Sequence, residues 1–135
     1  MKRLFLDTNI VLDLLEKREP FCNDAVRLFS LAYNKKVKLF VSPITFATAS
    51  YVLSKHEASE VNKLLSNLRQ LVSVATTNER TIDDALASQF TDFEDAIQYY
   101  SALTCKAEAI ITRNGKDFAH SKLPVLTAGE WLDNL

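Results

Sequence analysis

The sequence has few residues that interrupt regular structure or that bind soft metals. Its 135 residues include two glycines and three prolines, which excludes long irregular loops and favours closely connected helices and strands. The two cysteines and two histidines lack the spacing of a zinc or iron site. Cys22 and Cys105 are instead expected to be buried free thiols. Any metal chemistry must therefore rest on other side chains.

The chain also lacks a strong charge imbalance and a long apolar run. A formal net charge of −1 excludes a broadly basic surface that coats nucleic acid, although a small basic rim around an acidic pocket remains compatible with it. The first apolar run ends at Asp7, too early for an export signal, and no stretch approaches the length of a membrane span. We expect one domain over residues 1–135, located in the cytoplasm with no membrane association.

Short apolar runs alternate with helical periodicity along the chain. Strands are predicted at 4–6, 37–41, 71–75, 109–112 and 123–126. Apolar residues with helical spacing fall between these runs. This alternation predicts an α/β fold, with helices covering both faces of a mostly parallel sheet of about five short strands. The order of the strands in the sheet cannot be read from the pattern.

Two helix starts have the spacing of a capping box, namely Thr91 with Glu94 and Thr127 with Glu130. In the helix that follows Thr91, one stripe of residues is expected to face the core. This stripe consists of Phe93, Ala96, Ile97, Tyr100 and Leu103.

Carboxylates occur near the ends of the predicted strands. Asp7 ends the first apolar run, Asp95 lies near the start of a helix, and Asp117 closely follows the strand at 109–112. Because the carboxyl ends of parallel strands share one edge of a sheet, these three residues are expected to converge. Converging carboxylates raise one another's pKa unless a cation neutralises them. Their hard oxygen atoms suit Mg²⁺ or Mn²⁺ better than zinc.

The same carboxylates also have purely structural interpretations. Asp7 is a good N-cap residue, and Asp92 suits the first turn of a helix through the helix dipole. Asp117 could cap a turn while Phe118 packs inward. Asp13 is expected to be solvated on the first helix.

Four segments together resemble the PIN-domain family of metal-dependent ribonucleases, particularly its toxin-like bacterial branch. They are FLDTNIVLDLL at 5–15, SPITFATASYVL at 42–53, DFEDAIQYYSA at 92–102 and IITRNGKDF at 110–118. The resemblance implies a three-layer α/β/α sandwich with acidic residues that hold one or two Mg²⁺ or Mn²⁺ ions. It further implies an endoribonuclease that cleaves RNA phosphodiester bonds, including a role as the toxin of a toxin–antitoxin pair. An antitoxin protein and a homodimer would then be partners.

The resemblance assigns roles by position. Asp7 and Asp95 match two acidic residues of the family, and Asp117 falls in the final matching segment, so these three are the predicted catalytic and metal-binding residues. Residues predicted to support the metal or its water are Thr8, Asn9, Thr48, Asp92, Thr112 and Asn114. Residues predicted to contact RNA phosphates are Arg113, Lys116 and Lys122.

The chain departs from the family pattern at Thr48, where many relatives carry a glutamate, and at Asn114, where many carry an aspartate. With fewer negative charges, the centre should hold Mg²⁺ more weakly, although Asp92 or Glu94 could compensate. This departure favours a second hypothesis, a non-catalytic PIN-like module that binds RNA or a protein through a surface with a weakened metal site.

A third hypothesis is a phosphatase that uses Asp7 as its nucleophile. Enzymes of the haloacid-dehalogenase type need a second aspartate two residues later, where this chain has Asn9. The chain also leaves little room for the cap that such enzymes often carry. The sequence therefore disfavours a phosphatase.

Overall fold

Five parallel strands form the central sheet in the computed structural model, which describes residues 1–135. The strands are β1 (Lys2–Leu6), β2 (Val37–Val41), β3 (Val72–Val74), β4 (Ala109–Ile111) and β5 (Val125–Leu126). Their order is β3-β2-β1-β4-β5, and each neighbouring pair runs parallel. The central strand β1 pairs Leu4 with Leu39 of β2 and with Ala109 of β4. All five strands therefore end at one edge of the sheet.

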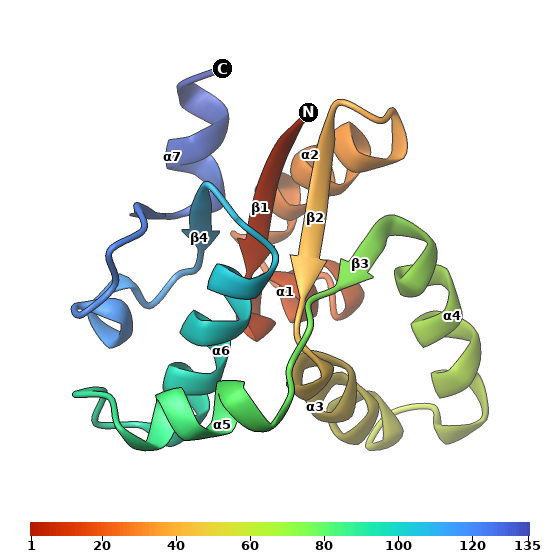
Figure 1. The fold of residues 1–135 in the computed structure, drawn as a ribbon. Coiled ribbons are helices and arrows are strands. Elements are labelled where there is room, and N and C mark those ends of the chain that lie inside the picture. The colour runs from red at the N-terminus through yellow and green to blue at the C-terminus, as the bar shows by residue number, and fades with distance from the viewer.

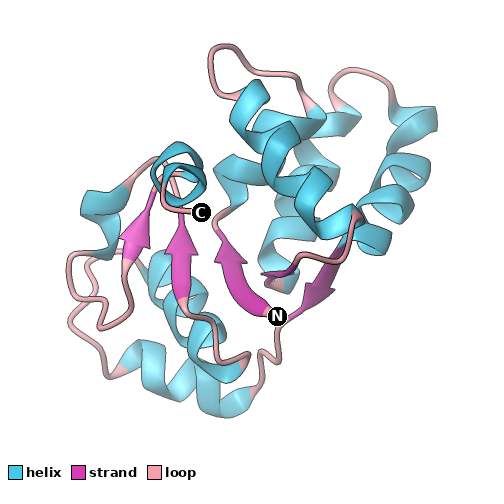
Figure 2. Cartoon of the chain, turned by 90° about the horizontal axis from the view of Figure 1, so that it is seen from above, coloured by secondary structure: helices cyan, strands magenta, loops and turns pink.

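Seven α-helices surround this sheet (Figure 1, Figure 2). They are α1 (Thr8–Leu15), α2 (Cys22–Tyr33), α3 (Pro43–Ser54), α4 (Val61–Leu71), α5 (Glu79–Leu86), α6 (Phe93–Thr104) and α7 (Ala128–Asp133). Two short 3₁₀ helices, η1 (Ala58–Glu60) and η2 (Gly115–Phe118), complete the chain. None of the helices is long and apolar enough to cross a membrane.

The hydrophobic core lies on both faces of the sheet, because side chains alternate along each strand. Leu4 and Leu6 of β1 pack into a cluster with residues of α1, α2, α4 and α7. Phe5, between them, points to the other face and packs with Tyr99 and Ala102 of α6. Helices on both faces confirm the predicted α/β/α sandwich around a parallel sheet of five short strands.

The two predicted capping boxes have different outcomes. At Thr127 and Glu130 both reciprocal hydrogen bonds are present, and they start α7 as expected. At α6 the prediction was wrong, because Asp92 is the N-cap and accepts a hydrogen bond from the backbone N–H of Asp95 at 3.0 Å. An aspartate one residue beyond Thr91 provides the cap instead of the threonine.

The predicted core stripe of α6 was also partly wrong. Phe93 and Leu103 are 46% and 40% exposed, whereas Gln98 and Tyr99 are buried. Helix α6 packs against the sheet on one side and against α5 on another, so its buried surface is wider than one apolar stripe. Polar residues on that buried surface interrupt the periodicity from which the stripe was predicted.

Both cysteines are free thiols. Cys105 is buried as expected, and burial raises its pKa to about 11. Cys22, by contrast, is half-buried at the start of α2 rather than fully enclosed.

Candidate functional site

Asp7 joins the end of β1 to the start of α1. Its backbone N–H donates to the carbonyl of Ile111 at 2.9 Å, which ties the turn to β4. The backbone is extended, and the carboxylate atom Oδ1 accepts a hydrogen bond from the N–H of Thr8 at 2.9 Å. The residue is thus the N-cap of α1, and its second oxygen, Oδ2, is left available for other groups.

Thr112, just after β4, binds that second oxygen. Its hydroxyl donates to Asp7 Oδ2 at 2.8 Å, and the threonine is only 1% exposed. The same hydroxyl accepts hydrogen bonds from the side-chain amide of Asn9 at 3.4 Å and from the backbone N–H of Asn114 at 3.0 Å. Four of the predicted polar residues, including Thr8, therefore surround one carboxylate.

Asp95 lies in the first turn of α6, at the same edge of the molecule. Its pKa is raised from 3.8 to about 7, first by burial and then by the negative charges of Asp92, Asp117, Asp7 and Glu94. These four carboxylates lie near enough to repel a charge on Asp95. The structure thus brings the three predicted ligands into one acidic neighbourhood.

Asp117 occupies the exposed side of η2, while the adjacent Phe118 is 2% exposed and packs into the core. The negative charges of Asp7 and Asp117 both raise the pKa of Asp95, but no three acidic, histidine or cysteine side chains are gathered closely enough to enclose one metal ion. None of the three carboxylates takes part in an ion pair within the chain. Their negative charge is therefore not balanced from within the protein.

This donor set fits a divalent cation of the Mg²⁺ or Mn²⁺ type. The groups at the edge are carboxylate, hydroxyl and amide oxygens, which hard cations prefer. A cation would also remove the repulsion that raises the pKa of Asp95.

Gln98 is a site residue that the sequence reasoning missed. It is 1% exposed on α6, and its side-chain amide donates to Asp7 Oδ1 and to the Thr8 hydroxyl, each at 3.4 Å. Its carbonyl oxygen accepts a hydrogen bond from Ser42. The sequence offered one signal for Gln98: it is a polar residue one turn after Asp95, on a helix face that must be buried.

Helix α3 closes the other side of Asp7. Thr45, in its first turn, is fully buried and shares a hydrogen bond of 2.8 Å with Thr8. Thr48 lies one turn further along α3 and is half-buried, at the position where the family resemblance leads one to expect a glutamate. On this side the Thr45 hydroxyl contacts the turn after Asp7, and α3 carries no carboxylate.

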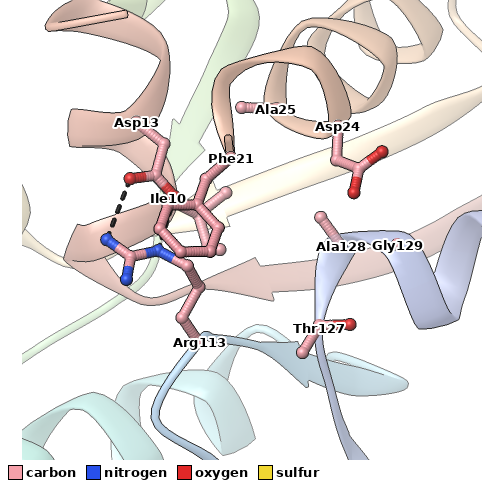
Figure 3. A pocket seen from close by; sticks show the side chains of 9 residues that line it. All are labelled: Ile10, Asp13, Phe21, Asp24, Ala25, Arg113, Thr127, Ala128 and Gly129. Atoms are coloured by element: carbon pink, nitrogen blue, oxygen red, sulfur yellow. Dashed lines mark hydrogen bonds and ion pairs between the residues drawn. The ribbon is translucent and has the colours of Figure 1, made fainter. Parts of the chain in front are cut away.

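Arg113 forms a salt bridge that the sequence did not predict. Its Nε donates to Asp13 Oδ2 at 2.8 Å and its Nη2 donates to Asp13 Oδ1 at 3.0 Å, while the ring of Phe21 stacks on the guanidinium at 4.0 Å (Figure 3). The expectation that Asp13 is solvated was wrong, because the residue is 1% exposed. The carboxylate is tolerated in the interior because the guanidinium satisfies both of its oxygens.

This pair borders a hollow of about 310 Å³ between α1, α2 and α7, distinct from the acidic edge (Figure 3). Among the residues predicted to contact RNA, Arg113 forms an ion pair with Asp13. Lys116 and Lys122 are exposed on the segment that carries Asp117. Contact with RNA remains a prediction for all three.

Comparison with solved structures finds the same fold in bacterial toxins. A toxin–antitoxin complex from Klebsiella pneumoniae contains a chain 25% identical to this one, with a TM-score of 0.69 and coverage of 93% of this chain and 97% of that chain. VapC20 of Mycobacterium tuberculosis, a toxin that cleaves the sarcin–ricin loop, is 15% identical, with a TM-score of 0.66 and coverage of 87% and 94%. VapBC2 of Rickettsia felis, bound to a DNA fragment from its promoter, is 19% identical, with a TM-score of 0.67 and coverage of 92% and 96%.

Comparison with curated proteins gives no match. The profile of the PIN domain, in contrast, matches residues 3–116, a range that includes β2 to β4 and all of β1 except Lys2, and that ends one residue before Asp117. The match extends over much more than half of the sequence. The chain therefore belongs to the PIN domain family.

Proposed function

We propose that this protein is a metal-dependent endoribonuclease that cleaves RNA phosphodiester bonds with Mg²⁺ or Mn²⁺. The observation that carries the proposal is the raised pKa of Asp95, caused by burial and by facing carboxylates that include Asp7 and Asp117. Such mutual repulsion costs stability unless a cation is bound, so it is a feature expected of a binding centre. The family membership and the ribonuclease toxin among the similar structures support the same activity.

In this proposal Asp7, Asp95 and Asp117 would hold the cation, and water would complete a coordination shell that these side chains do not enclose by themselves. When bound, the cation supplies an activated water and stabilises the negative charge that develops on the phosphate. Thr112 and the N–H of Thr8 hold the two oxygens of Asp7 in place, so this carboxylate needs little reorganisation. Asp92 adds negative charge beside Asp95 and caps α6.

The surrounding residues would orient the substrate. Asn9 and Asn114 converge on the Thr112 hydroxyl and present further polar groups near the reacting phosphate. Lys116, adjacent to Asp117, would contact a neighbouring phosphate of the RNA. Arg113 would contribute only the part of its guanidinium that Asp13 does not occupy.

Purified protein incubated with structured and unstructured RNA in Mn²⁺ tests this activity. We expect cleavage that EDTA abolishes and that Asp7→Asn reduces at least a hundredfold, while the protein stays folded. The matched control is Asp83→Asn, which removes an exposed carboxylate from α5 and should leave cleavage unchanged. Cleavage that survives both EDTA and Asp7→Asn would contradict the proposal.

We further propose that the protein acts in the cytoplasm as the toxin of a toxin–antitoxin pair, as a homodimer bound to an antitoxin. Similar folds occur in toxin–antitoxin complexes from several bacteria, which supports this role. A gene for a small DNA-binding protein directly upstream would identify the partner to test. Co-purification with that protein tests antitoxin binding, and light scattering of the isolated chain tests the homodimer. A monomer that does not bind the upstream protein would contradict both proposals.

Thr48 favours one alternative function, a non-catalytic PIN-like module that binds RNA or a protein. With a hydroxyl in place of a carboxylate, the centre has less negative charge to hold a cation. Calorimetric titration with Mg²⁺ and Mn²⁺ separates the two functions. The nuclease should bind Mn²⁺ more tightly than millimolar, whereas the binding module should show a millimolar response or none.

A further inference from the structure

The buried amide of Gln98 joins three separate parts of the acidic edge. Its nitrogen contacts Asp7 at the end of β1 and Thr8 at the start of α1, and its oxygen contacts Ser42 at the start of α3. Gln98 itself lies on α6, three residues after Asp95 and so on the same side of the helix. No buried side-chain nitrogen or oxygen in the chain lacks a hydrogen-bond partner.

The chemistry of Asp7 fixes which way this amide points. An ionised carboxylate only accepts hydrogen bonds, so the nitrogen of Gln98 must face Asp7 and the oxygen must face Ser42. Because Thr8 accepts from the same nitrogen, its own hydroxyl proton is free to bind Thr45. The amide of Gln98 therefore has one orientation, and it is set by the charge on Asp7, while in the Thr8–Thr45 hydrogen bond either hydroxyl can donate.

The hydroxyl of Ser42 binds Gln98 and does not cap α3. Ser42 occupies the N-cap position of α3, where a serine hydroxyl ordinarily accepts a hydrogen bond from the first turn, yet no such bond is present. The hydroxyl is instead fully buried and donates to Gln98. Such a contact holds the far end of the amide and so keeps its nitrogen directed at Asp7.

We propose that Gln98 is a positioning residue, whose amide holds Oδ1 of Asp7 so that the carboxylate faces the divalent cation in one orientation. This inference rests on the proposed function. Oδ1 is held by Thr8 N–H and Gln98, and Oδ2 by Thr112, so each oxygen has its own donor from a different element. Without Gln98, rotation of the carboxylate is restrained only from the α1 and β4 sides.

Replacing Gln98 by Met tests the proposal, because methionine keeps the length of the side chain but removes all three of its hydrogen bonds. Outer-shell partners of metal ligands typically contribute 10- to 100-fold in affinity or activity, and the 3.4 Å contact favours the lower end of that range. We expect Mn²⁺ to bind about tenfold more weakly in calorimetry and kcat to fall by a similar factor, with KM for RNA unchanged.

Two further variants separate positioning from simple loss of packing. Ser42→Ala leaves the amide in place but releases its oxygen, so it should weaken Mn²⁺ binding by about threefold, a smaller effect than Gln98→Met. Ser101→Ala removes another buried hydroxyl from α6, one that bonds Thr77 away from Asp7, and should leave Mn²⁺ affinity unchanged. Equal losses in all three variants would overturn the proposal.

Crystal structures of the metal-free wild type and of Gln98→Met provide a readout that does not depend on activity. We expect the Asp7 carboxylate to rotate or to become disordered in Gln98→Met; an unchanged carboxylate would overturn the positioning role. If Gln98→Met does not fold, the same comparison is made with Ser42→Ala. If the wild type does not cleave RNA, only the proposed function is contradicted. The role of Gln98 is still tested, because the orientation of the Asp7 carboxylate is compared without any measurement of activity.

Discussion

Asp13 and the carboxylates of the acidic edge differ in whether a basic side chain of the protein neutralises them. Asp13 is 1% exposed and gives both oxygens to the guanidinium of Arg113, itself covered by Phe21. Asp95 is surrounded by other acidic groups, and neither Asp7 nor Asp117 nearby has a basic partner. Asp13 is therefore neutralised by the guanidinium of Arg113, whereas the carboxylates of the acidic edge have no basic side chain beside them.

This difference separates structural charge from functional charge. A buried carboxylate with a bidentate arginine is internally neutral, and such pairs maintain one arrangement of the chain. A set of carboxylates that repel one another is unfavourable until something positive arrives. Neutralisation from outside is therefore the property that distinguishes the acidic edge from the Asp13–Arg113 pair.

The largest expected effect comes from removing the internal cation. Arg113→Ala leaves Asp13 charged and enclosed, and should lower the free energy of unfolding by about 3–5 kcal/mol in urea denaturation. Asp13→Ala should cost less, about 1–3 kcal/mol, because Arg113 is 25% exposed and can turn to water. The double variant Asp13→Leu with Arg113→Met should recover most of the loss; equal costs for the two single variants would contradict the asymmetry.

Adding a carboxylate to the acidic edge should have the next largest effect. Thr48→Glu supplies a further charged ligand on α3, and we expect Mn²⁺ to bind about tenfold more tightly in calorimetry. Thr48→Gln has the same size without the charge and is the matched control. If both variants bind Mn²⁺ equally, position 48 does not face the cation.

The pH dependence of stability should reveal the repulsion around Asp95. Between its ordinary pKa of 3.8 and about 7, the folded chain keeps a proton that the unfolded chain has lost. The free energy of unfolding in EDTA should therefore fall as the pH rises through this window, by about 1 kcal/mol or less because solvent screens the group.

Thermal unfolding from pH 4 to 8 measures this slope. Asp95→Asn should remove it, Mn²⁺ should flatten it, and Asp83→Asn should leave it unaltered. A wild-type slope that Asp95→Asn does not change would show that other groups cause it.

The smallest expected effect is at the ring that covers Arg113. Phe21 is 40% exposed, so its cation–π contact should contribute about 0.5–1 kcal/mol. Phe21→Leu should lower Tm by a few degrees in thermal unfolding. Tyr33→Leu, which alters a 75% exposed aromatic residue on the same helix, is the control and should leave Tm unchanged.

The order of strands and helices could be predicted because local patterns determine it. Strand β2 was predicted at its observed bounds, and Asp7 was placed at a strand end by the apolar run before it. The partners of Gln98 and Asp13 could not be predicted in this way. Gln98 contacts a residue 91 positions away and Asp13 one 100 positions away, so no local pattern marks either as buried.

Their burial follows from hydrogen bonds that form only when the sheet brings distant segments together. A polar residue on a helix is otherwise assigned to solvent, which is why Asp13 was misplaced and Gln98 overlooked. The family resemblance identified Asp7, Asp95 and Asp117 for testing. It also named Thr8 and Thr112, which hold the carboxylate of Asp7, whereas the contact from Gln98 became visible only in three dimensions.

The position of β4 beside β1 has a consequence for the protein during its synthesis. Thr112, which binds the carboxylate of Asp7, is synthesised 105 positions after it. Because β4 pairs directly with β1, the acidic edge cannot assemble until β4 has been made. A nascent chain that stops before β4 therefore carries Asp7 without Thr112 and Asp117, and the complete centre first exists once these residues have been added.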